Sequence, residues 1–259
     1  VELLQLRIGQ RLPLRAVQLL LRGRLFFAQS RHPLPQLCQS EQTFLIGIEE
    51  YQTHPTSKVN GATRAGAEKR MLQEWHYYFE NTRRWRNLRK ITVAQVQGTV
   101  FAAGLMLMWS CDLIVGSDDV VFADVVGTRL GMCGLEYFAH PWELGARKTK
   151  ELMLTGDSID IHEAHRLGMV SKVFPRAELE DSTLEFARRI AKLPTMTALM
   201  IKESVNETQD NQGFYNSLNA CFTIHQLNHA HWAEVHEDGW PAARPEDGIP
   251  SWKEAPPIV

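Results

Sequence analysis

The chain has 259 residues, 44% of them hydrophobic, and its 28 basic and 30 acidic side chains give a formal net charge of −2. This composition is enough for a sizeable core in one large or two small domains, and it provides no global field for nucleic acid or an anionic membrane. No apolar run reaches the roughly 18 residues of a membrane span, and the cysteines lack CxxC spacing, so we expect a soluble, cytoplasmic protein without nucleic-acid or membrane partners.

Residues 1–57 differ in composition from the rest of the chain. They contain six arginines and no lysine, and their apolar residues follow neither a period of 2 nor one of 3.6. We interpret 1–57 as an atypical, poorly ordered N-terminal segment. An amphipathic targeting or membrane-surface helix at 15–27 is the alternative, and residues 44–48 are a candidate strand.

A long helix is predicted from residue 63 onward. Its apolar and aromatic positions recur at steps of three and four residues and define a face that we expect to pack inward. These positions are Met71, Trp75, Tyr78, Thr82, Trp85 and Leu88. Eight basic residues against three glutamates between residues 64 and 90 make the opposite face positive. A solvated face and a contact with nucleic acid or a nucleotide phosphate both fit this charge.

The stretch 91–112 joins a strand to a helix through a turn of small residues. The β-branched residues of 91–96 predict a strand buried on both faces, which Gly98 ends. Ala102, Ala103 and Gly104 then lead into an apolar helix at 105–109 that we expect to be buried all round. Because the first N–H groups of a helix lack an intrahelical partner, this turn can hold a developing oxyanion; simple packing is the alternative role.

Strands and helices alternate between residues 113 and 174. Strands are predicted at 113–115 and 120–122, around a turn at 117–119, and at 169–174. Glycines at 127, 131 and 134 mark a loop, and a helix predicted at 141–154 begins with proline. Asp160, followed by Glu163, predicts the N-cap of a helix that ends at Gly168. We therefore expect an α/β core over 58–193 with a mainly parallel sheet.

The C-terminal third is predicted to be helical, with helices at 179–191, 196–205 and 214–235. Five prolines after residue 240 prevent the last helix from continuing, so we expect the final twenty residues to be extended or to wrap over a neighbouring part of the fold. Residues 194–259 are accordingly a helical C-terminal region with a Pro-rich tail.

Two stretches of the α/β core resemble the crotonase, or enoyl-CoA hydratase/isomerase, superfamily. KITVAQVQGTVFAAGLMLMWSCDLIVGSDDVVFAD, at 90–124, is similar to the family's K-P-x-I-A-x-x-x-G-x-x-x-G-G-G-x-x-x-x-x-x-C-D core. GARKTKELMLTGDSIDIHEAHRLGMVSKVFP, at 145–175, is similar to its G-x-x-x-A-x-x-x-x-L-T-G-x-x-x-x-A-x-x-A-x-x-x-G-L-V-x-x-V motif, and KESVN follows at 202–206. The resemblance covers about 88–206. It implies an α/β spiral of ββα units with a helical C-terminal region, assembled as trimers or pairs of trimers.

The same resemblance implies an acyl-CoA thioester as the substrate, with coenzyme A as part of that substrate and no separate cofactor. Family members hold the thioester carbonyl between two backbone N–H groups, and Ala103 matches one of these donors. Gly104, Met106, Gly131 and Gly134 match positions around the substrate. The other donor lies in an A-G-x-D turn in the family; we find no such turn, and 1–57 also lack the family's opening strands.

The acid–base residues depart from the hydratase pattern. Hydratases of this family use two glutamates, whereas isomerases manage with one carboxylate. Met106 stands at the first glutamate position, and the second falls at or near Val126. Asp124 is therefore the first candidate for proton transfer, with a turn or helix cap as its alternative role, and Glu136 is the second. Further candidates are Tyr137, His140 and Glu143.

Three histidines, His225, His229 and His236, can share one face of the last long helix, as metal ligands do. No cysteine or carboxylate completes a zinc motif with them, and the resemblance implies that this helix serves CoA binding and subunit contacts. We therefore expect no metal.

Residues and resemblance together predict an enoyl-CoA hydratase of fatty acid metabolism, which adds water to a 2-enoyl-CoA and holds the thioester enolate in a backbone oxyanion hole. Enoyl-CoA isomerisation or other enolate chemistry is one alternative. A non-catalytic acyl-CoA-binding or scaffold paralogue is the other, because both glutamates and the first oxyanion turn are missing.

Overall fold

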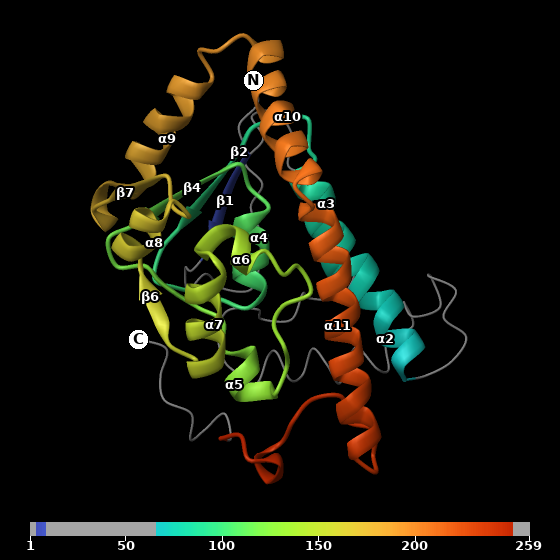
Figure 1. Ribbon diagram of the computed structural model, residues 1–259. Helices are drawn as coiled ribbons and strands as arrows, with labels where there is room; N and C mark the ends of the chain where they lie inside the picture. Colours follow the sequence, from blue (N-terminus) through green and yellow to red (C-terminus); the bar gives the residue numbers. More distant parts are fainter. Residues whose placement is uncertain (1–3, 9–65, 251–259) are drawn as a thin grey trace, which may run out of the picture.

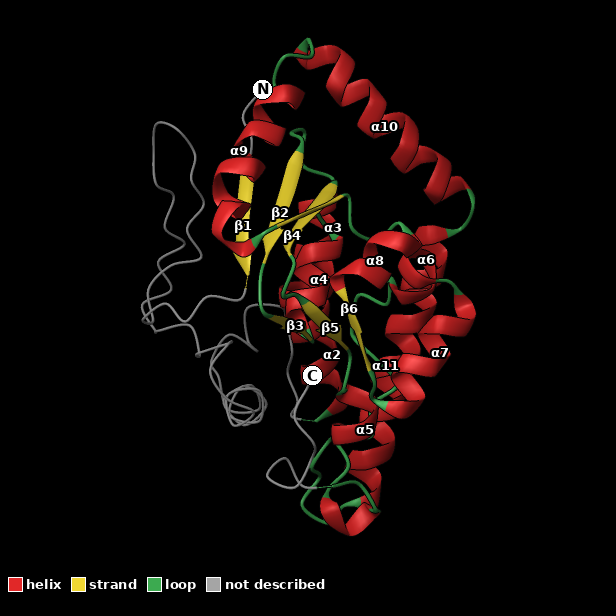
Figure 2. Ribbon diagram, turned by 90° about the vertical axis from the view of Figure 1, so that its left-hand side faces the viewer, coloured by secondary structure: helices red, strands yellow, loops and turns green. Residues whose placement is uncertain are grey.

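A four-stranded parallel sheet forms one side of the core. The computed structural model describes residues 4–8 and 66–250, and the sheet order is β1-β2-β4-β7 (Figures 1 and 2). Its strands are β1 Leu4–Ile8, β2 Thr92–Val96, β4 Leu113–Ser117 and β7 Lys172–Phe174. All five residues of β2 are buried, as expected for a central parallel strand.

The N-terminal segment contributes to this sheet, contrary to the expectation from its composition. β1 pairs in parallel with β2, with Leu4 opposite Thr92 and Ile8 opposite Val96. The prediction that 1–57 supply no opening strand was therefore wrong at 4–8, where leucine and isoleucine flank a single arginine. The helix predicted at 15–27 and the strand predicted at 44–48 lie outside the described residues.

A second sheet, of order β3-β5-β6, lies beside the first. Its strands are β3 Thr99–Phe101, β5 Val121–Ala123 and β6 Ser158–Asp160, and β6 runs antiparallel to β5. The turn at 117–119 is confirmed by the hydrogen bond from Val120 N to Ser117 O. However, the strands on either side of it belong to different sheets, so the chain crosses between sheets here and forms no hairpin.

Helix α4, Ala103–Trp109, occupies the centre of the core as the small-residue entry predicts. Leu105, Met106 and Met108 are each at most 3% exposed. Leu107 is 38% exposed, so the helix is not buried all round. One edge of α4 reaches the surface.

The long N-terminal helix is confirmed, but its buried face differs from the predicted one. It consists of α2 Ala67–Glu74, a π-helical segment η2 Trp75–Glu80, and α3 Asn81–Arg86. The π turn changes the phase of the helix, which leaves Met71 and Trp75 more than a third exposed. The buried positions include two arginines of the face predicted to be solvated: Arg70, Gln73, Glu74, Phe79, Thr82 and Arg86. Arg86 pairs with Asp210 at 3.1 Å and lies over the Phe214 ring, so it holds α3 against the C-terminal helices.

Short helices fill the region after the second sheet. They are α5 Val126–Leu130, α6 His140–Leu144, α7 Ala146–Thr155 and α8 Ile161–Leu167. Gly145, at φ 77° and ψ 156°, divides the single helix predicted at 141–154, and the loop predicted around Gly127 contains α5. The N-cap prediction is confirmed, because Asp160 Oδ1 accepts a 2.8 Å hydrogen bond from Glu163 N and Gly168 ends α8 in the left-handed region.

The C-terminal region is helical, as predicted. After the 3₁₀ turn η3 Arg176–Glu178 come α9 Leu179–Ile190, α10 Thr195–Asn211 and α11 Phe214–Val235, then η4 Pro245–Asp247. Helix α11 lies along α2 and α3 on one side of the molecule (Figure 1). The described part of the Pro-rich tail returns over α5, where Ala243 N donates to Leu130 O at 2.8 Å.

Candidate functional site

The entry to α4 contains a strained alanine. Ala102 has φ 48° and ψ −123°, and it is the one residue other than glycine with a positive φ in the described part of the chain. The first bond that closes the helix runs from Leu105 N to Ala102 O at 2.9 Å. The N–H groups of Ala103 and Gly104 therefore precede the hydrogen-bonded ladder, as an oxyanion site requires.

Asp124 and His140 form a buried pair at the edge of the second sheet. Asp124 follows β5, His140 begins α6, and Asp124 Oδ2 lies 2.8 Å from His140 Nε2, with both side chains 2% exposed. The other oxygen, Oδ1, accepts a 3.0 Å hydrogen bond from Val126 N at the start of α5. Both oxygens of Asp124 are thus engaged. The bond from Val126 N, two residues further on, agrees with the alternative role of Asp124 in a turn, whereas the N-cap position of α5 is held by Val125.

The ring of His140 is held by aromatic side chains as well as by Asp124. Trp109 approaches it edge to face at 4.7 Å between centroids, and Phe138 lies at the same distance. His140 Nδ1 is buried and has no hydrogen-bond partner within the described residues. Asp124 and His140 together clamp the two ends of segment 125–139, which contains Glu136.

Glu136 is one of two carboxyl groups of this region whose pKa is raised toward neutral pH. Burial raises the pKa of Glu136 to about 7; His225 opposes this shift, and the carboxylates of Glu74 and Asp124 add to it. The pKa of Tyr78 is raised by burial and by the nearby charges of Glu136 and Glu74. The pKa of Glu136 thus responds to the charges of Asp124, Glu74 and His225.

The remaining proton-transfer candidates, Glu143 and Tyr137, differ in what surrounds their ionisable groups. Glu143 lies in the first turn of α6, and burial alone raises its pKa to about 7. Burial also raises the pKa of Tyr137, whose fully buried hydroxyl has no hydrogen-bond partner within the described residues. Met106 is 3% exposed in α4, and its match to the position of the first family glutamate stays a prediction.

Two glycines predicted to line the substrate are bound to α11. The carbonyl of Gly131 accepts from Trp232 Nε1 at 2.9 Å, and a Cβ at this position would lie 2.5 Å from Ala243 Cβ. The carbonyl of Gly134 accepts from the His225 ring at 2.8 Å. These contacts explain the glycines by close packing, and their roles in substrate binding stay predictions, as does that of Gly104.

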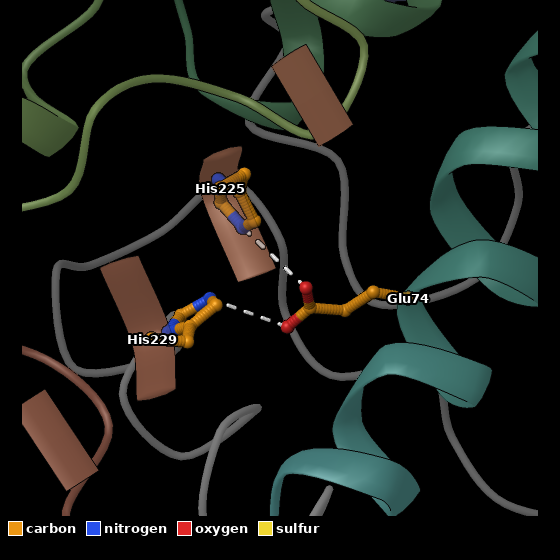
Figure 3. Close-up of side chains that lie close together, drawn as sticks. All are labelled: Glu74, His225 and His229. Atoms are coloured by element: carbon orange, nitrogen blue, oxygen red, sulfur yellow. Dashed lines mark ion pairs between the residues drawn. The ribbon is translucent and has the colours of Figure 1, made fainter. Parts of the chain in front are cut away.

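A second carboxylate and histidine cluster joins α2 to α11 (Figure 3). Glu74 reaches from α2 toward His225 and His229, with Oε2 at 3.4 Å from His225 Nε2 and Oε1 at 3.3 Å from His229 Nε2. His236 is not part of it, because its ring pairs with Asp247 at 2.9 Å. Sequence reasoning identified both histidines but missed Glu74, which is distant from them in sequence. Glu74 was assigned to the helix face that was predicted to be solvated, so nothing indicated that it packs against α11.

The cluster is strongly polarised. Burial on its own would raise the pKa of Glu74, but the nearby imidazoles of His229 and His225 outweigh it and hold that pKa well below its usual value. Burial would lower the pKa of His225, but the nearby side chains of Cys133, Glu74 and Glu136 outweigh it and raise that pKa. The pocket therefore favours positive charge beside Glu74.

The geometry can be compared with known proteins. The family model described as enoyl-CoA hydratase/isomerase matches residues 59–236, which is more than half of the chain. The chain belongs to the enoyl-CoA hydratase/isomerase family. The crotonase resemblance at 90–124 and 145–175 is thereby confirmed, and the match also takes in the two helices that carry Glu74, His225 and His229.

Relatives of this family member include mycobacterial proteins. It is 67% identical over 205 residues to the protein named "Putative enoyl-CoA hydratase EchA13" of Mycobacterium tuberculosis, which covers 79% of the chain and 64% of the relative. The chain thus spans less than two thirds of the length of that relative.

Solved structures agree on the crotonase fold. A probable enoyl-CoA hydratase from Mycobacterium smegmatis matches with a TM-score of 0.67 and 43% identity, over 69% of this chain and 72% of that one. A second, from Mycobacterium thermoresistibile, has a TM-score of 0.67 and 39% identity over 72% and 74% of the two chains. Among the described helices, none combines the length and apolar character needed to cross a bilayer.

Proposed function

We propose that the chain is an enoyl-CoA hydratase that adds water across the double bond of a 2-enoyl-CoA in fatty acid metabolism. The observation that carries this proposal is the match of the enoyl-CoA hydratase/isomerase family to residues 59–236. We assign the proton transfer to Glu136, because burial raises the pKa of this carboxyl group to about 7. A carboxyl group with this pKa can accept and return a proton at neutral pH. It lies on the segment that Asp124 and His140 clamp at both ends.

In the proposed reaction, the N–H of Ala103 donates a hydrogen bond to the thioester oxygen of the bound substrate. The carboxylate of Glu136 takes one proton from a water molecule, and the water oxygen bonds to the β-carbon as the double-bond electrons move toward the thioester oxygen. Glu136 then returns that proton to the α-carbon, so all atoms of the water end in the product. One well-placed donor stabilises such an oxyanion by roughly 3 to 4 kcal/mol.

We assign both steps to one carboxyl group because, by the resemblance, Met106 stands at the first glutamate position of the family and the second falls at or near Val126. Asp124 takes the role of a positioning residue here, since its two oxygens bind His140 and Val126 N. Isomerisation of a 3-enoyl-CoA is the second candidate, and the same observation favours it: one carboxyl group can move a proton between two carbons of the substrate.

The proposal includes the partners and the compartment. The ligand is an acyl-CoA thioester, and the reaction needs no cofactor beyond the CoA of its substrate. A trimer or pair of trimers is supported by large apolar side chains exposed on α10 and α11, namely Met196, Met200, Ile201, Val205, Ile224, Leu227 and Val235. A reducing cytoplasm is supported by the free thiols of Cys111, Cys133 and Cys221. Light scattering of the purified chain tests the assembly.

Incubation with crotonyl-CoA tests the activity. We expect the absorbance of the conjugated thioester to fall with enzyme-dependent kinetics, and mass spectrometry to find a product heavier by one water. A matched incubation with a 3-enoyl-CoA detects isomerisation, because the conjugated absorbance would then rise.

Two results would overturn the hydratase proposal. Isomerisation without hydration would reassign the reaction to the isomerase class. Measurable binding of crotonyl-CoA without turnover of either substrate would identify a non-catalytic acyl-CoA-binding protein, in agreement with the missing glutamates.

A further inference from the structure

The cluster of Glu74, His225 and His229 gathers three metal-ligating groups on two helices. One ligand atom of each residue lies within 4.8 Å of the others. The three side chains are 6% or 7% exposed, so bulk water does not separate them. Glu74 comes from α2 and both histidines come from α11, one helical turn apart, which directs their rings to the same side (Figure 3).

The two ion pairs of the cluster are longer than charge-assisted hydrogen bonds. Charge-assisted N–H···O bonds between ionised groups are about 2.7 to 2.9 Å long. The two Nε2 to carboxylate distances here are 3.4 and 3.3 Å. Two ligands at about 2.0 to 2.1 Å from a tetrahedral ion are themselves roughly 3.3 Å apart. The separation of carboxylate and imidazoles therefore suits an ion between them.

The outer atoms of both rings are held as they are in metal sites. His225 Nδ1 lies 2.8 Å from the carbonyl of Gly134, and His229 Nδ1 lies 2.6 Å from the carbonyl of Pro241. A carbonyl can only accept, so each Nδ1 carries the hydrogen and each Nε2 is left to face Glu74. Ligating histidines characteristically make this outer hydrogen bond.

The carboxylate has its own support. Gln226 Nε2 donates a hydrogen bond to Glu74 Oε2, which fixes the orientation of the carboxylate. His225 Nε2 is buried and makes no hydrogen bond within the described residues. An inward-facing nitrogen without a hydrogen bond, opposite an oriented carboxylate, is the arrangement that a ligand set needs before an ion binds.

We propose that Glu74, His225 and His229 bind one divalent transition-metal ion of the zinc class, as a structural cross-link between α2 and α11. Three protein ligands leave a fourth tetrahedral position for a water molecule. Through the outer hydrogen bonds, the ion also anchors the Gly134 loop and the start of the tail at Pro241. The site is independent of the proposed hydration, in which Glu136 and Ala103 act.

Zinc binding to chelator-treated protein tests the proposal by isothermal titration calorimetry. We expect one Zn²⁺ per chain. Loss of an outer-shell partner costs roughly 10- to 100-fold in affinity, so loss of a ligand in Glu74→Gln or His229→Gln is expected to cost more than about 100-fold. His231→Gln is the matched control, because His231 lies on the same helix and is exposed; it is expected to bind Zn²⁺ as the wild type does.

Two further readouts separate a built site from surface binding. Co²⁺ in place of Zn²⁺ is expected to give the visible absorption of tetrahedral coordination in the wild type and in His231→Gln alone. Zn²⁺ is expected to raise the thermal midpoint of the same two proteins. Circular dichroism verifies folding, and His229→Gln decides the test where Glu74→Gln does not fold.

The absence of saturable Zn²⁺ binding by the wild type would overturn the proposal. So would equal binding by the wild type and His229→Gln, or a loss of equal size in His231→Gln. In each of these cases the cluster is an ion triad of a carboxylate and imidazoles without a metal.

Discussion

Two of the buried groups of carboxylate and imidazole in the described part of the chain differ in spacing. Asp124 and His140 lie 2.8 Å apart and close a local segment of the chain. Glu74 lies 3.3 to 3.4 Å from His229 and His225 and joins two helices that are distant in sequence. The first is a direct hydrogen-bonded pair, whereas the second has the spacing of ligands around an ion.

The difference shows how partners decide what a carboxylate can do. One oxygen of Asp124 contacts His140 and the other accepts from Val126 N, so both oxygens hold neighbouring parts of the chain in place. Glu74 faces two imidazoles whose outer nitrogens are already bound to carbonyls. Residue type alone does not distinguish a carboxylate that holds two chain segments together from one that belongs to a set of metal ligands. The number of carboxylate and imidazole atoms without other hydrogen-bond partners distinguishes them.

The largest effect is expected at Glu136, whose pKa responds to charges from both groups. Glu136→Gln keeps the shape of the side chain and removes its ability to exchange a proton, so crotonyl-CoA hydration is expected to fall by about 10²- to 10⁴-fold. Stopped-flow or steady-state absorbance measures this. Glu143→Gln is the control, since Glu143 owes its raised pKa to burial alone. Similar losses in both variants would remove Glu136 from the mechanism.

The next effect is on stability, at the hydrogen-bonded pair. Asp124→Ala removes the cap on Val126 N and leaves His140 buried without its partner, so the free energy of unfolding is expected to fall by roughly 2 to 4 kcal/mol. Asp160→Ala removes a cap alone, at an exposed site, and is expected to cost about 1 kcal/mol. Urea unfolding compares the two variants. Equal losses would show that the contact between Asp124 and His140 adds nothing to the cap.

The pH dependence of activity and of stability is expected to report the ionisation of Glu136 and Glu143. Activity that needs the Glu136 carboxylate rises with pH through about 7, and Glu136→Gln lacks this rise.

The stability of the fold, in contrast, is expected to fall as the pH rises. Because the pKa values of Glu136 and Glu143 are raised to about 7 from 4.5, their contribution is fully present below about pH 4.5 and is lost as the pH rises through 7.

Urea midpoints measured from pH 5 to 8 check this sign. Glu143→Gln is expected to reduce the decline in stability across that range while leaving the rise in activity in place. A stability that rises through pH 7 in the wild type and is unchanged in Glu143→Gln would contradict the burial of these groups.

The smallest effect is expected at Ala102, which belongs to neither cluster. Ala102→Gly relieves the positive φ but increases the backbone freedom of the unfolded chain, so the change in unfolding free energy is expected to stay within about 1 kcal/mol. Ala102→Val adds a branched side chain to the same strained backbone and is expected to destabilise the fold by more than the glycine variant changes it. Thermal unfolding of the two variants tests this order.

Local signals predicted much of the fold. The helix predicted at 214–235 agrees with α11, and the cap of α8 was predicted from Asp160 and Glu163, because such elements depend mainly on neighbours in the sequence. The crossing between sheets at 117–119 was missed because a turn residue does not specify which strands pair. The buried Arg86 was missed because its partners, Asp210 and Phe214, come from the other end of the chain.

The candidate site divides in the same way. The entry to α4 was identified from consecutive small residues, and Glu136 and His140 were named as proton-transfer groups from their place in the segment. Their pKa and pairing depend on burial, which spacing does not reveal. Glu74 was assigned to no site, because only the packing of α2 on α11 brings it to the histidines.

The π turn η2 Trp75–Glu80 directs Glu74 toward α11. In a regular α-helix, residues five apart differ in direction by about 140°, yet Glu74 and Phe79 are both buried. Deleting one residue within η2 would restore regular winding and rotate α2 by about 100° relative to α3. A family member one residue shorter here would present a different side chain to α11. We therefore expect an alignment gap in this helix to distinguish relatives that lack the cluster from those that share it better than a replaced histidine does.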